Sequence, residues 1–441
     1  MIEKILQNKL IFIGIFTVIG FLGTIPIFSK IFGFICLVLP IIIIHKSRNI
    51  NEEAFIMSSF IVGAEVYIRM TGGFVLYETG KYAVIFYLIL GMLYGRFKQE
   101  LSFQYILYIL LLLIGILFTK VPDGESMRKE ILFNLSGPLV LGISAIYFYR
   151  RPVSKKVLMS GLFFALLPLF SMISYLYFRT PDLDELIFNT EANFETSGGF
   201  GPNQVATAIG FGVLIITIFM ISKEKLSGYL ILDSLILIYF VFRGLLTFSR
   251  GGIITGLICI ISFAFFFILY KKISFRILLK YIFIVGFFIV SIWLYTSNVT
   301  KGMLDNRYTG KSAKGFKTED VTSGRADIFE LQFENFIDNP LGIGVGNGKF
   351  KRKFNVHEVT AASHNEIGRL LEEHGYIGFF LLLLLLIVPL FNFFRGNYYQ
   401  KALIISFYLM WFLTINHSAM RVALPGFIYA LSLIIITDID E

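Results

Sequence analysis

The chain has 441 residues, of which 56% are hydrophobic and only 16% are charged, and its mean hydropathy is +0.75. This composition excludes an ordinary soluble domain and indicates a membrane protein that crosses the bilayer many times. The formal net charge of +9 gives no reason to expect nucleic acid as a partner, because the basic residues fall in short connections between apolar runs.

Apolar runs of membrane-spanning length recur along the whole chain. A hydrocarbon core of about 30 Å requires roughly 20 apolar residues per helix. The fold class predicted is therefore an all-α polytopic membrane protein with about 12 to 14 transmembrane helices and a long, partly helical extracytoplasmic loop. The first run is expected to be a retained signal anchor. We place the helices near residues 10–28, 30–44, 54–70, 80–95, 101–119, 132–149, 156–178, 203–222, 227–248, 251–270, 275–296, 372–394, 402–416 and 421–437.

The connections between these runs alternate in charge. If the N terminus is cytoplasmic, every second connection is basic, as the positive-inside rule requires. Both termini are then cytoplasmic, and the acidic segment 179–202 and the long segment 297–371 lie outside. The basic residues of the inner connections are Lys46, Arg48, Arg96, Lys98, Arg150, Arg151, Lys155, Lys156, Lys223, Lys225, Lys271, Lys272, Arg276, Lys280, Arg395 and Lys401.

Four parts follow from this pattern. Residues 1–200 hold N-terminal transmembrane helices, and 201–296 hold core transmembrane helices. Residues 297–371 form the extracytoplasmic loop, and 372–441 hold the C-terminal transmembrane helices. Because the loop is the one long polar stretch, we expect the chemistry there.

The long loop contains a helical pattern. Apolar residues recur at helical spacing over 324–337, with Thr322 or Ser323 as the expected N-cap. The pair Asn339-Pro340 should end this helix. The glycines of 342–348 on alternate positions favour a tight structural turn over a phosphate-binding loop, since the P-loop spacing is absent. Ser363 is expected to cap a helix that continues into the next span.

Several short motifs occur in a fixed order from residue 200 to residue 380. Together they resemble the O-antigen ligase and Wzy-type O-antigen polymerase superfamily. The motifs are Gly201-Pro202-Asn203, Ser249-Arg250-Gly251-Gly252, Gly324-Arg325, Asn339-Pro340-Leu341-Gly342-Ile343-Gly344, and His364-Asn365 followed by Glu373 and Gly375. The N-terminal half adds only its hydropathy.

The resemblance implies a membrane-embedded glycosyltransferase of the GT-C-like kind. Its donor would be a glycan on a polyprenyl diphosphate such as undecaprenyl diphosphate, and it would need neither a metal nor a cofactor. Guanidinium groups suit a diphosphate because they present a planar fork of donors, so Arg250 and Arg325 are the candidates there. His364 is the candidate base for the acceptor hydroxyl.

Further residues are candidates for substrate contacts, and each has a structural alternative. Arg250 could reach lipid headgroups instead, and Arg325 could pair with Asp327 or Glu330. His364 could be an ordinary polar loop residue. Arg243 could extend the diphosphate site or pair with Asp233 or Glu65. The candidates for substrate binding are Asn203, Arg243, Asn365, Lys349 and Arg352, and His417, Arg421 and Glu373 are added as residues near the same surface.

Three functions are distinguished, and the first is favoured because about 14 spans and a moderate loop without a large C-terminal soluble domain resemble that subgroup. The first is a Wzy-type polymerase for O-antigen or capsule, which joins lipid-linked repeat units. The second is an O-antigen ligase, which moves the finished glycan to lipid A core or to protein. The third is a lipid-linked sugar flippase or another transporter, which would spread charges through both halves of the bundle. The expected location is the bacterial cytoplasmic (inner) membrane, with a chain-length regulator and a flippase of the same pathway as candidate partners.

Overall fold

The computed structural model describes residues 2–95, 100, 102–317, 324–351, 353–354, 359–360 and 363–438, the side chains of 278, 281, 282, 353, 354, 359 and 360 excepted. Within these residues the chain is mostly helical with very little strand, so the predicted all-α membrane fold is confirmed. Six helices are long and apolar enough to cross a bilayer, and shorter apolar helices accompany them. The six are Pro26–Ser47, Met127–Phe148, Lys155–Arg179, Pro202–Ile221, Arg250–Lys271 and Glu366–Arg395.

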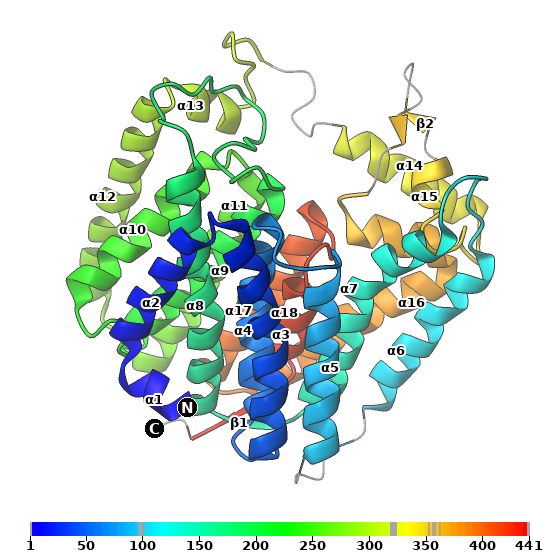
Figure 1. The fold of residues 1–441 in the computed structure, drawn as a ribbon, viewed down its shortest axis with the longest axis horizontal. Coiled ribbons are helices and arrows are strands. Elements are labelled where there is room, and N and C mark those ends of the chain that lie inside the picture. The colour runs from blue at the N-terminus through cyan, green and yellow to red at the C-terminus, as the bar shows by residue number, and fades with distance from the viewer. Residues whose placement is uncertain are drawn as a thin grey trace.

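The N-terminal helices form one packed group (Figure 1). Helix α8 lies at its centre with 94% of its apolar window buried, which is the pattern of a helix that is apolar all round. Helix α4 packs along α8 and is buried on nearly every side. The helices are α1 Ile2–Gln7, α2 Lys9–Leu22, α3 Pro26–Ser47, α4 Glu53–Met70, α5 Thr79–Tyr94, α6 Phe103–Ile114 with the 3₁₀ turn η1 Gly115–Phe118, α7 Met127–Phe148 and α8 Lys155–Arg179.

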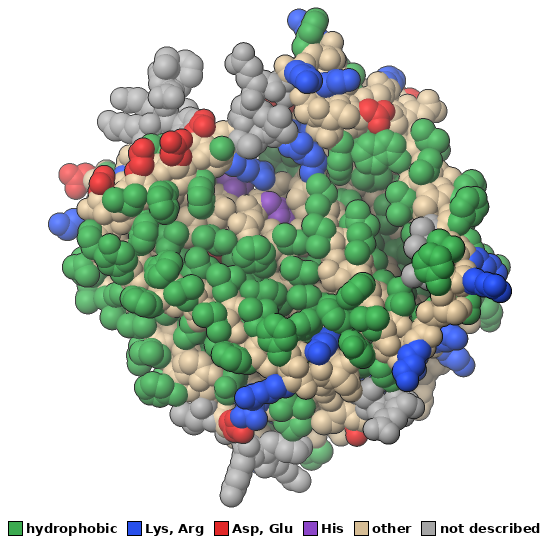
Figure 2. Space-filling view, turned by 180° about the vertical axis from the view of Figure 1, so that it is seen from behind, with side chains coloured by type: hydrophobic (Ala, Val, Ile, Leu, Met, Phe, Trp, Pro, Cys, Tyr) green, Lys and Arg blue, Asp and Glu red, His purple; other side chains and the backbone are tan. Residues whose placement is uncertain are grey.

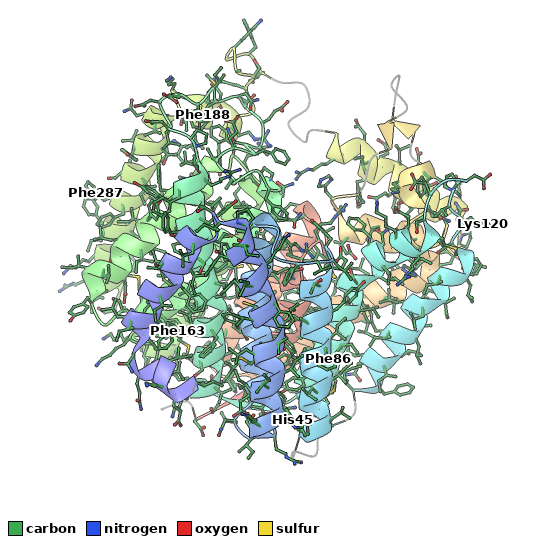
Figure 3. The ribbon with its side chains drawn as sticks, in the orientation of Figure 1. His45, Phe86, Lys120, Phe163, Phe188 and Phe287 are labelled. Atoms are coloured by element: carbon green, nitrogen blue, oxygen red, sulfur yellow. The ribbon has the colours of Figure 1, made fainter. Side chains whose placement is uncertain are left out.

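The second half of the chain adds a packed group of three helices, α9, α11 and α17, and the elements of the long loop. Helices α9 and α17 both pack against α11, whereas α12 presents most of its apolar side chains, Phe287 among them, to the outside (Figure 3). The helices are α9 Pro202–Ile221, α10 Leu230–Leu246, α11 Arg250–Lys271, α12 Phe275–Val299, α13 Met303–Tyr308, α14 Arg325–Asp338, α15 Gly348–Lys351, α16 Glu366–Arg395, α17 Tyr398–His417 and α18 Leu424–Leu431.

The break predicted between spans 10–28 and 30–44 is wrong, because α2 ends at Leu22 and α3 begins at Pro26, and the last predicted span is wrong as well. Residues 421–437 do not form a continuous helix, because α18 ends at Leu431 and the chain then becomes extended. Strand β4, Ile435–Thr437, pairs in parallel with β1, Pro152–Ser154. The bond from the Ile435 amide to the Arg151 carbonyl, at 2.9 Å, begins this pairing. The short hairpin of β2, Lys353–Phe354, and β3, Val359–Thr360, is the other strand pair described.

The molecule has two distinct ends. Both termini, and His45, lie at one end, and α13, α14 and α15 of the long loop lie at the opposite end (Figures 1 and 3). Hydrophobic side chains cover the middle of the face seen in Figure 2, with most of the visible charged side chains nearer the two ends. This distribution is typical of a bilayer-embedded bundle. We call the end that carries α13 to α15 the loop end.

Candidate active site

Two helices begin side by side at the loop end. The Ser249 hydroxyl donates to Oδ1 of Asn203 at 2.7 Å and joins the first turn of α9 to the start of α11. Gly252 lies against the α9 backbone, where an added Cβ would meet the Ala206 carbonyl carbon at 2.3 Å. Arg250 is the first residue of α11 and is half-buried. The positive ends of two helix dipoles therefore meet beside Arg250.

Three arginines gather at this point, one from each of three elements. Arg250 begins α11, Arg307 lies on α13 and Arg325 is the first residue of α14. An Nη1 of Arg250 donates to the Arg307 carbonyl at 3.3 Å. Arg307 itself donates to the backbone carbonyls of Phe248, at 3.3 Å, and Thr190, at 2.9 Å. We call Arg250, Arg307 and Arg325 the arginine cluster.

The charges of the arginine cluster oppose one another. Burial lowers the pKa of Arg307, and nearby Arg250 and Arg325 lower it further, while Tyr308 and Glu191 act in the opposite direction. Burial also lowers the pKa of Arg325, again with a contribution from Arg250. Among the residues that the structure describes, the ion pairs within 4.0 Å do not include Arg307 or Arg325. A bound anion would relieve this repulsion, and bidentate phosphate contact is what guanidinium groups provide.

Two histidines lie near the cluster. His417, the last residue of α17, fits against Gly251, where an added Cβ would meet its ring at 2.4 Å. Its Nδ1 lies 2.8 Å from the Leu413 carbonyl and must donate there, and its Nε2 faces the Thr207 hydroxyl at 3.2 Å. Arg325 and His364 both lie close enough to affect the charge of His417. His364 is exposed to solvent, so a substrate can reach it.

The residues on either side of His364 are fixed by hydrogen bonds. Asn365 is the N-cap of α16, and its Oδ1 accepts from the amides of Ile367, at 2.9 Å, and Gly368, at 3.1 Å. The predicted cap, Ser363, is therefore wrong by two residues. The Ser363 hydroxyl instead accepts from the Asn365 amide, two residues later, at 3.1 Å. This local hydrogen bond leaves Asn365 in the cap position.

The glycine segment after α14 is a structural turn. Gly342, Gly344 and Gly346 have φ values of 81°, 91° and 78°, a region that side chains disfavour. An added Cβ at Gly342 would meet the Glu373 carbonyl oxygen at 2.4 Å. Oε1 of Glu373 accepts from the Gly346 amide at 2.9 Å, and Arg369 binds its other oxygen at 2.7 Å. Glu373 thus holds this turn against α16.

Other predicted site residues lie apart from the arginine cluster. Nη2 of Arg243 donates to the Leu176 and Thr196 carbonyls and to the Thr180 hydroxyl, which ties α10 to α8 and to the segment before α9. Lys349 pairs with Glu130 at 2.6 Å on another part of the loop end. Arg352, and the expected caps Thr322 and Ser323, lie outside the described residues. The helix predicted at 324–337 is confirmed as α14, which ends before Asn339.

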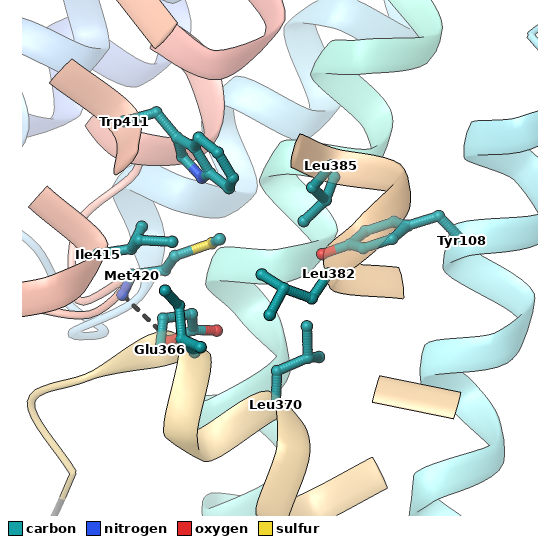
Figure 4. Close-up of a pocket in the computed structure, with 9 residues that line it drawn as sticks. Tyr108, Glu366, Leu370, Leu382, Leu385, Trp411, Ile415 and Met420 are labelled. Atoms are coloured by element: carbon teal, nitrogen blue, oxygen red, sulfur yellow. Dashed lines mark hydrogen bonds between the residues drawn. The ribbon is translucent and has the colours of Figure 1, made fainter. Parts of the chain in front are cut away.

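The face seen in Figure 2 is hollowed in its upper part. Figure 2 shows histidine and Lys or Arg side chains around a hollow in the upper part of that face. Beneath the start of α16 lies a separate cavity of about 10 Å³, lined by Tyr108, Glu366 and Trp411 among others (Figure 4). That volume holds about one water molecule, so it excludes a sugar. We take the hollow, with its histidine and basic side chains, as the candidate substrate site.

Sequence reasoning missed Arg307. It lies on a six-residue helix in the long loop, in no motif that the resemblance uses. Its position in the long polar segment 297–371 was the only signal in the sequence, and many surface arginines lie in such polar segments. Sequence also gave no indication that residues 418–423 approach Ser363.

A family model matches part of the chain. The family model described as O-antigen ligase matches residues 235–383, about a third of the chain, from within α10 into α16. Comparisons with curated proteins and with solved structures give no match. The matched residues include the whole arginine cluster and His364. Over this stretch the chain is therefore similar to the O-antigen ligase family, which supports the resemblance to the O-antigen ligase and Wzy-type polymerase superfamily.

Proposed function

We propose that this protein is a polysaccharide polymerase of the Wzy type, for O-antigen or capsule. It transfers a glycan from undecaprenyl diphosphate to a sugar hydroxyl of another lipid-linked repeat unit. The observation that carries the proposal is the meeting of Arg250, Arg307 and Arg325 at the loop end, where Arg325 and the exposed His364 both lie near His417. The arginines and His364 fall within the stretch matched by the family model. We take the loop end to be extracytoplasmic and the termini to be cytoplasmic, in a bacterial inner membrane.

The chemistry follows from the groups at the site. The imidazole of His364 takes the proton of the acceptor hydroxyl, and the acceptor oxygen attacks the anomeric carbon. The bond from that carbon to the diphosphate oxygen breaks, and the polyprenyl diphosphate leaves with the electron pair. The arginine cluster stabilises the negative charge that grows on the leaving group. A single displacement of this kind inverts the anomeric configuration, and no metal or cofactor takes part in it.

The second candidate is an O-antigen ligase, which the description of the matched family favours. The donor chemistry is the same, and only the acceptor differs. Purified protein in vesicles, given a defined polyprenyl diphosphate saccharide, distinguishes the two. A ladder of products indicates a polymerase, and a single transfer to a different acceptor lipid or protein indicates a ligase. If neither reaction occurs with a competent donor and acceptor present, the proposed function is wrong.

A further inference from the structure

The turn between α17 and α18, residues 418–423, is held by side chains from a distant helix. Oε2 of Glu65 accepts from the Ala423 amide at 2.6 Å, and Nη1 of Arg69 donates to the Arg421 carbonyl at 2.8 Å. Both side chains come from α4, more than 350 positions earlier in the chain. Glu65 and Arg69 thus bind two backbone groups of one irregular turn.

This turn needs to be held. Ala419 has a φ of 51°, which an alanine adopts only when its surroundings enforce it. The Met420 amide is bound by Oε2 of Glu366 at 3.4 Å (Figure 4). The turn therefore takes its shape from α4 and α16 and not from its own preference.

The turn at 418–423 also holds Ser363, the residue before His364. Nη2 of Arg421 donates to the Ser363 carbonyl at 2.7 Å, and its guanidinium lies 4.6 Å from the centre of the Phe133 ring. On the other side of His364, Nδ2 of Asn365 donates to Oδ1 of Asn416 at 3.3 Å. The backbone around His364 is therefore fixed from both sides by the end of α17 and the turn that follows.

The pair on α4 is a costly feature for a structural role alone. Glu65 and Arg69 form an ion pair at 2.5 Å with side chains that are 0% and 1% exposed. Glu78 and Lys81 form a second pair beside them, at 2.7 Å, and Glu78 lies 3.6 Å from Arg69. Buried ion pairs are often no more stabilising than apolar residues of the same volume. Glu65 and Arg69, however, form hydrogen bonds to the backbone of the turn at 418–423, and apolar side chains could not form such bonds.

We propose that Glu65 and Arg69 are positioning residues for glycan transfer. They fix residues 418–423, and through Arg421 they fix the backbone that presents His364. This inference rests on the proposed function for the role of His364. It also extends the functional unit beyond the matched family region, because α4 lies in the N-terminal half.

A matched pair of double variants tests the proposal. E65Q/R69M removes the ion pair on α4. E52Q/R151M removes the ion pair of Glu52 and Arg151, which is also buried, spans 2.8 Å and lies at the end that carries the termini. We expect E65Q/R69M to lower kcat about 10- to 100-fold, the scale of a displaced catalytic group, while KM for the lipid-linked donor changes little. E52Q/R151M should keep the kcat of the unaltered protein. An equal loss of kcat in both variants would overturn the proposal.

Amide hydrogen exchange gives a readout independent of activity. In E65Q/R69M, amides of 418–423 and 363–367 should exchange faster than in the unaltered protein, whereas E52Q/R151M should leave both segments unchanged. Unchanged exchange in E65Q/R69M would contradict the positioning role. If the unaltered protein transfers no glycan but exchange changes as expected, the proposed function fails and the structural link stands.

A double-mutant cycle then tests the route through Arg421. If Glu65 and Arg69 act through Arg421, adding R421M to E65Q/R69M should lower kcat by much less than R421M does alone. Fully multiplicative losses would show that the two sites act separately, and the proposed route would be wrong.

Discussion

At the end that carries the termini, Arg151 donates to both carboxylate oxygens of Glu52, at 3.0 and 2.8 Å, and stacks on the Tyr147 ring at 4.1 Å. At the loop end, Arg307 donates to two backbone carbonyls and faces Arg250 and Arg325. The charge of Arg151 is neutralised by the carboxylate of Glu52. Arg307 has no carboxylate within 4.0 Å among the described residues, so its positive charge is not cancelled there by direct contact. Arg151 therefore has the environment of a structural residue, and Arg307 that of an anion-binding residue.

The largest effect should follow from loss of the proposed base. His364→Ala removes the exposed imidazole, and we expect transfer to fall by roughly 10²- to 10⁴-fold with folding intact. The control is His45→Ala, at the other end of the molecule, where the imidazole contacts the Tyr94 hydroxyl at 2.6 Å. Initial rates with a lipid-linked donor measure both. Transfer at the rate of the unaltered protein in His364→Ala would rule out the base assignment.

Substitution of Arg307 and of Arg151 by glutamine tests the difference between the two ends directly. Arg307→Gln should lower transfer about 10²- to 10³-fold, because it removes one of the donors that we propose for the leaving diphosphate. It should lower the melting temperature little, because Arg307 is half-buried and its hydrogen bonds to described residues go to the carbonyls of Phe248 and Thr190.

Arg151→Gln is its counterpart. It leaves Glu52 buried without its cation, so it should destabilise the protein by about 3–5 kcal/mol and leave the rate per folded molecule unchanged. Melting in detergent and rates normalised to folded protein give both quantities. If the two variants exchange these outcomes, the distinction between the two ends is wrong.

The membrane fold could be predicted because its signal is distributed over many residues. Runs of apolar residues identify spans whatever they pack against, and helices such as α8 and α9 agree with the expected ranges within a residue or two. The error at 421–437 has a physical cause. An apolar segment also suits a short helix followed by a strand, and pairing with β1 is a long-range contact that the local pattern does not contain.

The candidate site was predictable only where a motif carried it. Arg250, Arg325 and His364 stand in recognisable short motifs, and the structure places them near one another. Arg307 has no such motif. Arg243 has the same type of side chain as the cluster, yet it binds three oxygens between helices. Whether an arginine is enclosed by acceptors or faces other arginines depends on tertiary packing, which local sequence does not specify.

The backbone at the loop end also differs from that of an outward-facing helix, and substitutions of Gly342 and Gly286 test this difference. Their effects on stability and transfer should be the smallest of those predicted. Gly342→Ala places a side chain at a φ of 81° and against the Glu373 carbonyl, so we expect a loss of about 1–3 kcal/mol from the backbone conformation alone. At Gly286, on α12, an added Cβ would meet no described atom within 4 Å beyond its chain neighbours and its own helix backbone, so Gly286→Ala should leave the melting temperature unchanged or slightly higher. Melting curves in detergent measure both variants. Because the turn at Gly342 packs α16 beneath the loop, Gly342→Ala should also slow transfer, and equal melting temperatures for the two variants would show that this turn does not constrain the loop end.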